Sequence, residues 1–199
     1  MLFPFLTMLY GQECDSGFVW LEDIPIGCGG EHNCFYEADL NVLQIMINNS
    51  SETINMSLDD NEDGIMEPVE LGYTEWVDGR LVALDCFLSD IMPCNLSGPL
   101  PQNIGDLEYL EALWLSGNQL SGEIPFEIGR LNKLNSLRLF DNQLTGEIPS
   151  SVGHLIQLEF LYLQDNQLTG DVPSEIKSLI HLKRLNLEGN QLTVDIQED

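Results

Sequence analysis

The segment from residue 59 to residue 70, DDNEDGIMEPVE, places oxygen-bearing side chains at a regular spacing that suits a metal ion. Asp59, Asn61 and Asp63 stand at alternate positions, Gly64 follows them, and Glu70 closes the segment. Ca²⁺ is bound by carboxylate and carbonyl oxygens, and this spacing directs several of them toward one centre. So many carboxylates in a short segment repel one another unless a cation neutralises them. The spacing therefore predicts calcium binding here.

The segment matches the twelve-residue EF-hand loop, D-x-[DN]-x-[DN]-G-x5-E, at every specified position. The expected ligands are five side chains and one backbone carbonyl, that of the fourth residue in this series: Asp59, Asn61, Asp63, Ile65, Glu67 and Glu70. Gly64 permits the sharp turn at position six, and Pro68 stands where a following helix could begin. A single site in an extracellular module binds at about 10⁻⁴–10⁻³ M, so the ion would act as a structural clip. The alternative is a solvated acidic loop.

The cysteines offer a second kind of chemistry, and their odd number leaves at least one thiol unpaired or intermolecular. They are Cys14, Cys28, Cys34, Cys86 and Cys94. In an exported chain, local disulfides are the favoured interpretation of the first three. Zinc held by Cys28, His32 and Cys34 is an alternative, although the spacing fits no common zinc pattern. The pairing stays open.

Charge and composition exclude several classes of function. The chain has 199 residues, with 33 Asp or Glu against 7 Lys or Arg, for a formal charge of -26. Nucleic acid and anionic lipid are bound through clusters of basic residues, which are missing here, so neither is an expected partner. Cations and partners with basic patches suit this charge. No P-loop, G-x-S-x-G or HExxH motif occurs, so no enzymatic activity is expected.

The first 80 residues are expected to contain an export signal and a cap. Residues 1–12 begin with the apolar run MLFPFLTMLY, which is typical of a secretory signal peptide. No later stretch reaches the roughly 20 apolar residues of a membrane helix, so no membrane span is expected. Residues 13–80 then form a cysteine-containing cap. Within it, FYEADLNVLQIMINN predicts an amphipathic helix through Leu40, Leu43 and Ile47.

A regular repeat dominates residues 81–199. Four segments of equal length align without gaps, and each contains one asparagine at the same place: Asn118, Asn142, Asn166 and Asn190. An earlier copy aligns through Cys94, with a five-residue insertion between Cys86 and Cys94, so about five repeats are expected. A strand reading L-x-L directs its leucines inward, where only stacking against neighbouring copies can bury them. The asparagine would satisfy backbone groups at the bend that follows.

The unit L-x-x-L-x-L-x-x-N-x-L-[ST]-G-x-[IV]-P resembles the plant-type leucine-rich repeat, found in receptor-like ectodomains, polygalacturonase-inhibitor proteins and secreted bacterial relatives. The resemblance implies an α/β solenoid: a right-handed stack with a concave parallel β-sheet and an N-terminal helical cap. It also implies a second strand at L-[ST]-G-x-[IV]-P. The last copy departs from the pattern, with Val194 in place of Gly and Gln197 in place of Pro, as is usual where a stack ends.

The outward positions of the repeat strands carry residue types that dominate protein interfaces. Adjacent strands lie about 4.8 Å apart, so these side chains should be neighbours on the concave face. The candidate partner-binding residues are Trp114, Arg138, Phe140, Phe160, Tyr162, Gln164 and Arg184. Asp141 and Asp165 edge the patch and favour a partner with basic groups. The alternative is that aromatic residues only suit strands and cover one another.

The sequence therefore predicts a secreted or cell-surface binding module that recognises a protein or peptide through its concave face and is stabilised by calcium. Two alternatives remain. One is a calcium-stabilised structural or adhesive surface protein without a discrete partner. The other is an inhibitor of a secreted polysaccharide-degrading enzyme, which only the resemblance implies.

Overall fold

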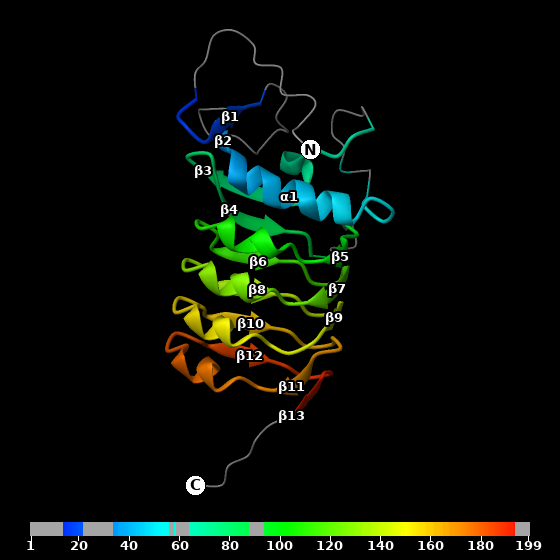
Figure 1. Ribbon diagram of the computed structural model, residues 1–199, viewed down its shortest axis with the longest axis vertical. Helices are drawn as coiled ribbons and strands as arrows, with labels where there is room; N and C mark the ends of the chain where they lie inside the picture. The colour runs from blue at the N-terminus through cyan, green and yellow to red at the C-terminus, as the bar shows by residue number, and fades with distance from the viewer. Residues whose placement is uncertain (1–13, 22–33, 56–57, 59–63, 88–93, 194–199) are drawn as a thin grey trace.

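The computed structural model describes residues 14–21, 34–55, 58, 64–87 and 94–193. These form an elongated stack, with helix α1 (Glu37–Asn49) across one end and successive turns of chain below it (Figure 1). The expected solenoid, with its parallel sheet and N-terminal helical cap, is confirmed. The predicted export signal, residues 1–12, lies outside the described residues. Within the described part, no helix combines the length and the apolar character that a membrane crossing needs.

One long sheet, called here the main sheet, runs the length of the stack in the order β12-β10-β8-β6-β4-β3. Its strands are β3 (Tyr73–Val77), β4 (Arg80–Asp85), β6 (Ala112–Trp114), β8 (Ser136–Arg138), β10 (Phe160–Tyr162) and β12 (Arg184–Asn186). All pairs are parallel except β3 with β4. From β6 onward each leucine opposes the equivalent leucine of the next repeat: Leu113, Leu137, Leu161 and Leu185. Equivalent positions of successive repeats therefore pair with one another in the sheet.

The second strands expected from the repeat are also present. They form a three-stranded sheet of β5 (Ser97–Pro99), β7 (Gln119–Glu123) and β9 (Gln143–Thr145), and a pair of β11 (Thr169–Asp171) and β13 (Gln191–Thr193). Gly146 has a φ of 74°, and a Cβ there would lie 2.8 Å from Cγ of Glu123. The backbone conformation therefore favours glycine at this turn, whereas the flexible, exposed Glu123 side chain can move aside.

Short 3₁₀ helices connect the second strand of each repeat to the next strand of the main sheet. They are η3 (Gln102–Asp106), η4 (Phe126–Arg130), η5 (Ser150–His154) and η6 (Ser174–Ser178). Each follows a proline in extended conformation, which holds the chain straight until the turn begins. His154, at the end of η5, and His181, three residues after η6, are both exposed. Among the described residues, no three or more His, Cys, Asp or Glu side chains are grouped so that they could hold a metal ion.

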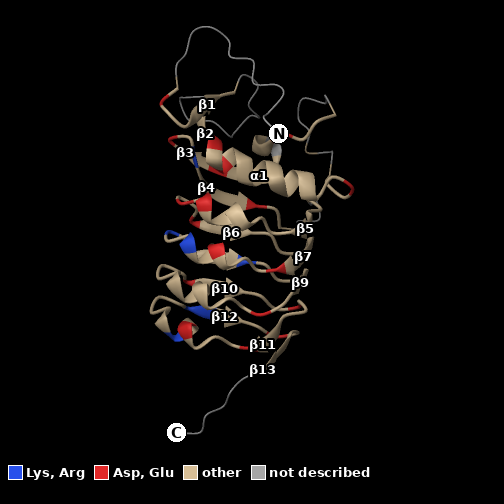
Figure 2. Cartoon of the chain, viewed as in Figure 1, with Lys and Arg blue, Asp and Glu red and all other residues tan. Residues whose placement is uncertain are grey.

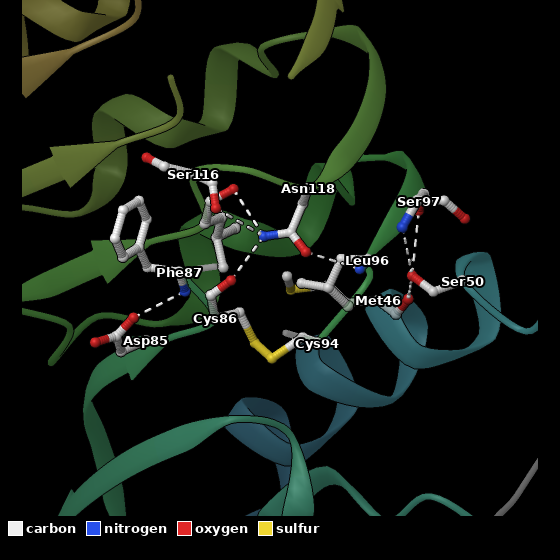
Figure 3. The surroundings of a disulfide bond; sticks show 11 residues. Met46, Ser50, Asp85, Cys86, Phe87, Cys94, Leu96, Ser97, Ser116 and Asn118 are labelled. Carbon is white, nitrogen blue, oxygen red and sulfur yellow. Dashed lines mark hydrogen bonds between the residues drawn. A yellow bond between two sulfur atoms is a disulfide. The ribbon is translucent and has the colours of Figure 1, made fainter. Parts of the chain in front are cut away.

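The buried asparagines form a ladder inside the bend of each repeat. Asn142 is 9% exposed; its Oδ1 accepts the N–H of Leu120 at 3.0 Å, and its Nδ2 donates to the carbonyls of Leu115 at 2.9 Å and Leu139 at 3.1 Å. The same pattern recurs in the repeat on each side, and Figure 3 shows it for Asn118. One amide thus satisfies backbone groups of two successive repeats, as the sequence predicts.

Helix α1 closes the first repeat. Leu40, Leu43 and Ile47 are buried as predicted, at 3%, 0% and 6% exposed. Asp39 on the same face is also fully buried, which the sequence pattern did not indicate. Its carboxylate pairs with Arg80 at 3.0 Å and accepts the N–H of Leu81 at 2.9 Å. Burial raises the pKa of the Asp39 carboxyl above its ordinary value of 3.8, while the bonds from Arg80 and Leu81 oppose that rise.

The cap also contains a hairpin that sequence reasoning missed. Strand β3 runs antiparallel to β4, joined by Asp78 and Gly79 with φ values of 49° and 72°. Two central residues with positive φ define the tight turn that suits a hairpin, and Asp-Gly is its common signal. A second small pair, β1 (Phe18–Trp20) with β2 (Cys34–Tyr36), lies beside it. The signal was therefore present at Asp78, ahead of the repeats.

Two disulfides settle part of the open cysteine pairing. Cys14 bonds to Cys34, and Cys86 bonds to Cys94 across the five-residue insertion (Figure 3). The zinc alternative is wrong for Cys34, because its sulfur is in a disulfide. Cys28 lies outside the described residues. The second bridge is buried against Gly72, where a Cβ would lie 2.7 Å and 2.8 Å from the two sulfurs.

Candidate partner-binding face

A row of three large side chains crosses the middle of the main sheet. Trp114 on β6 pairs in register with Arg138 on β8, which pairs with Tyr162 on β10. Cζ of Arg138 lies 4.5 Å from the centre of the Trp114 ring and 5.6 Å from that of Tyr162. These distances are those of cation–π contacts. We call these three residues the central row; they are neighbours on adjacent strands, as the repeat alignment predicts.

Hydrogen bonding holds the indole ring of Trp114 in this row. Its Nε1 donates to Oγ of Ser136 at 2.8 Å, and Ser136 is buried. Ser136 opposes Phe160 on β10, which in turn opposes Arg184 on β12. The hydrogen bond to the buried Ser136 hydroxyl therefore fixes the orientation of the indole ring.

A pair of phenylalanine rings borders the central row. The ring centres of Phe87 and Phe140 are 5.5 Å apart. They belong to repeats on either side of Ser116, which is fully buried (Figure 3). A small residue between them lets the two rings meet. Sequence reasoning missed Phe87, because the insertion after it breaks the register of the repeat; its position directly after Cys86, as Ser116 follows Leu115, is the signal that could have found it.

The outward side chains of the main sheet pack against one another but remain partly accessible to solvent. The predicted partner-binding residues are half-buried, apart from Arg184, which is exposed. Within the described residues, three polar side-chain atoms here are buried and make no hydrogen bond: Oγ of Ser116, Nε of Arg138 and Oε1 of Gln164. Most buried polar groups in folded proteins are paired. Unpaired atoms concentrated among aromatic rings are therefore positions where a bound molecule could complete the hydrogen bonding.

Two aspartates edge the face in a strained conformation. Asp141 and Asp165 both have a φ of 55°, in the left-handed region. The matching residues of the flanking repeats are Gly117 and Gly189, which adopt this region without a steric penalty. Both aspartates are exposed. The two central repeats thus carry a carboxylate where their neighbours have no side chain.

The predicted calcium loop is described only at its C-terminal end. Asp59, Asn61 and Asp63 lie outside the described residues, and so does any geometry that involves them. Gly64 has a φ of 84°, the conformation that position six of the loop requires. Glu67 is half-buried between buried Met66 and Val69. The turn begins at Pro68 as expected, but it is the three-residue 3₁₀ helix η2 (Pro68–Glu70) rather than a full helix.

A second cluster of aromatic and basic residues lies where the cap meets the first repeats. Cζ of Arg80 is 3.9 Å from the centre of the Tyr36 ring and 4.3 Å from that of Tyr109, and Nζ of Lys133 is 3.6 Å from the Tyr109 centre. A groove of about 690 Å³ runs beside them. The Asp39 carboxylate already neutralises Arg80. This cluster therefore fastens the cap to the stack.

Comparisons with known proteins identify the repeats. Residues 109–131 and 133–155 match the Leucine Rich Repeat model, and residues 156–198 match the model Leucine Rich repeats (2 copies). A search of curated proteins finds no match. The repeats are leucine-rich repeats, and the fold is that of a leucine-rich repeat solenoid.

Among solved structures, the BIR3–SERK2 complex from Arabidopsis thaliana is similar, with a TM-score of 0.62 and 29% identity over 77% of this chain and 82% of that one. The ectodomain of the Arabidopsis thaliana membrane receptor kinase GASSHO1/SCHENGEN3, in complex with Casparian strip integrity factor 2, gives 0.59 and 28% over 76% of this chain. A plant ice-binding protein gives 0.63 and 31% over 79%. This chain spans 21% of the GASSHO1 chain and 50% of the ice-binding protein.

Proposed function

We propose that this chain is a secreted or cell-surface leucine-rich repeat module that binds a protein or peptide on the outward face of its main sheet. The role is recognition rather than catalysis. Two of the similar structures are complexes, and one of them contains a receptor ectodomain. The two disulfides favour an oxidising compartment. A face of this kind is already ordered, so binding costs little conformational entropy.

The observation that carries the proposal is the central row. Trp114, Arg138 and Tyr162 occupy outward positions on three successive strands, and their rings and guanidinium are in contact. Trp, Tyr and Arg are the residue types that most often dominate binding energy. The leucines of the same strands fill the interior, so the stack does not need these side chains for its core.

The test begins with capture of partners from the native secretome by the full chain. The affinity of a captured partner is then measured for the wild type and for Trp114→Ala and Tyr162→Ala. Each substitution should weaken binding by about 2 kcal/mol, roughly 30-fold. Phe126→Ala is the matched control, because Phe126 is an exposed aromatic residue on η4, away from the main sheet. Equal affinity of all variants would refute binding at this face.

Calcium stabilisation is part of the proposal and rests on the match of residues 59–70 to the loop pattern. The positive φ of Gly64 supports it, since the pattern requires that conformation at position six. The loop stands between α1 and the β3–β4 hairpin. An ion there would join the cap helix to the first strands of the main sheet.

Calcium titration tests this part independently of any partner. Heat of binding with a dissociation constant of about 10⁻⁴–10⁻³ M is expected, and EDTA should lower the melting temperature. Glu70→Gln should abolish both effects, because it removes the expected bidentate carboxylate. Glu123→Gln, which removes an exposed carboxylate from β7, should abolish neither. A chain without heat of binding or thermal shift has no calcium site in this loop.

A further inference from the structure

Arg138 lacks an acidic partner among the described residues, which is unusual in a protein with so many carboxylates. Acidic residues outnumber basic ones by 33 to 7, and they are spread along the whole stack (Figure 2). Within the described residues, the ion pairs are Arg80 with Asp39 and Lys183 with Glu159. Arg138 has no carboxylate within ion-pairing distance there, although it lies half-buried at the centre of the main sheet. A buried charge is normally paired, so this exception requires an explanation.

Neighbouring aromatic rings explain the position of the guanidinium but leave its hydrogen bonds unmade. Trp114 and Tyr162 are both within cation–π distance of Cζ, and the indole is itself held by Ser136. Contacts of this kind involve the face of the planar guanidinium and leave the N–H groups at its edge able to donate hydrogen bonds. Nε of Arg138 is buried and donates to no described acceptor. The guanidinium is therefore held in place while its Nε–H donor stays unused.

An acceptor just beyond the end of the next strand, β10, is unused as well. Oε1 of Gln164 is buried and makes no hydrogen bond within the described part of the chain. Gln164 follows Tyr162 by two residues, so it points to the same side of the sheet. Arg138 and Gln164 thus leave a charged donor and a neutral acceptor open in neighbouring repeats. A bound peptide segment carries both complementary groups, a carboxylate and an N–H.

We propose that Arg138 is the receptor for an Asp or Glu side chain of the bound protein segment, which its guanidinium holds through two N–H groups between Trp114 and Tyr162. Gln164 accepts an N–H from the same segment. This inference rests on the proposed function, because it specifies the chemistry of the partner on that face. The partner is mixed in charge: its acidic residue meets Arg138, and its basic groups meet Asp141 and Asp165 at the edge.

A random peptide library tests the inference without knowledge of the natural partner. The peptides are displayed inside a scaffold protein, so that they carry no free terminal carboxylate, and are selected on the full chain with the Trp114→Ala variant as counter-selection. Selected peptides should share an Asp or Glu at one position. A second library with free C-termini separates the two sources of carboxylate. Selection of terminal carboxylates without an acidic side chain would overturn the assignment to a side chain.

The best peptide is then synthesised with blocked termini, together with a version whose acidic residue is changed to the amide. Arg138→Gln and the amide peptide should each weaken binding at least 10-fold, and combining them should add little. Arg138→Lys should recover part of the affinity, because lysine restores the charge but not the planar guanidinium that donates two parallel hydrogen bonds. Arg130→Gln, the same charge change at an exposed residue of η4, should alter binding less than twofold.

Each contrary outcome has a distinct meaning. Peptides that need Trp114 but bind Arg138→Gln as well as wild type overturn this inference and leave the proposed function intact. If no selected peptide depends on Trp114, or none is retained, the proposed function fails too. The melting temperature of Arg138→Gln should lie close to that of wild type, because the guanidinium makes no ion pair with a described residue and its two cation–π contacts contribute only modestly to stability. A melting temperature several degrees lower would make Arg138 a structural residue and refute the inference.

Discussion

The two sides of the main sheet follow different rules, although the same short strands build both. On the inward side the residue type repeats: Leu113, Leu137 and Leu161 oppose one another in register, and each is fully buried. On the outward side the matching positions hold Trp114, Arg138 and Tyr162, so residue type changes at every repeat. The fold needs the inward residues to be alike because each rung packs on the next. It places no such demand on the outward residues, which are free to serve binding.

The inward side should show the largest effect. Leu137→Ala removes a fully buried side chain at the centre of the stack, and should lower the free energy of unfolding by about 3 kcal/mol in urea denaturation followed by circular dichroism. The matched change is Leu185→Ala on β12, where the leucine is 43% exposed. It should cost about 1 kcal/mol, since water already reaches the site. Equal losses would mean that position in the stack does not determine the contribution of each leucine.

The asparagine ladder should show an intermediate effect. Asn142→Ala leaves the N–H of Leu120 and the carbonyl of Leu115 without their partners in a buried bend, so the free energy of unfolding should fall by about 2 kcal/mol. Asn190→Ala at the last repeat is the comparison. Asn190 makes the same kind of hydrogen bonds, to Leu168 and Leu163, but it is only partly buried. Water can replace those bonds, and the loss there should be about half as large.

These contrasts also mark what could be predicted from sequence. Regular spacing predicts both the register of the main sheet and the contacts of the central row, because one constant offset places every later strand. Prediction fails where contacts do not follow that offset. Arg80 pairs with Asp39, which belongs to the cap helix, and strand β3 joins the sheet from the cap through a tight turn. The insertion before Cys94 hides Phe87 for the same reason.

The choice of cysteine partners was open for a physical reason as well. The sequence alone permits a disulfide between any two of the five cysteines. The folded chain selects the pair, because it places the Cα atoms of Cys86 and Cys94 5.4 Å apart. Periodicity places neither Cys14 nor Cys34, because both precede the repeats. The partner-binding and calcium assignments stay predictions, since they concern molecules that the fold alone does not select.

The smallest effect should come from the strained aspartates, and here stability and binding should change in opposite directions. Asp141→Gly and Asp165→Gly replace residues at a φ of 55° with the residue that the flanking repeats use. Release of the left-handed strain should raise the free energy of unfolding by up to about 1 kcal/mol each. If the carboxylates meet basic groups of the partner, affinity should nevertheless fall several-fold, measured with the captured partner or selected peptide.

Asparagine variants separate charge from backbone in this experiment. Asn tolerates the left-handed region about as well as Asp, so Asp141→Asn and Asp165→Asn should leave stability nearly unchanged and weaken binding as much as the glycine variants do. Higher salt should reduce the difference between wild type and variants, because the charges are exposed. A gain in stability with unaltered affinity would show that the two carboxylates serve neither the fold nor binding. A loss of affinity alongside that gain would show that this edge of the sheet gives up stability to keep its charge.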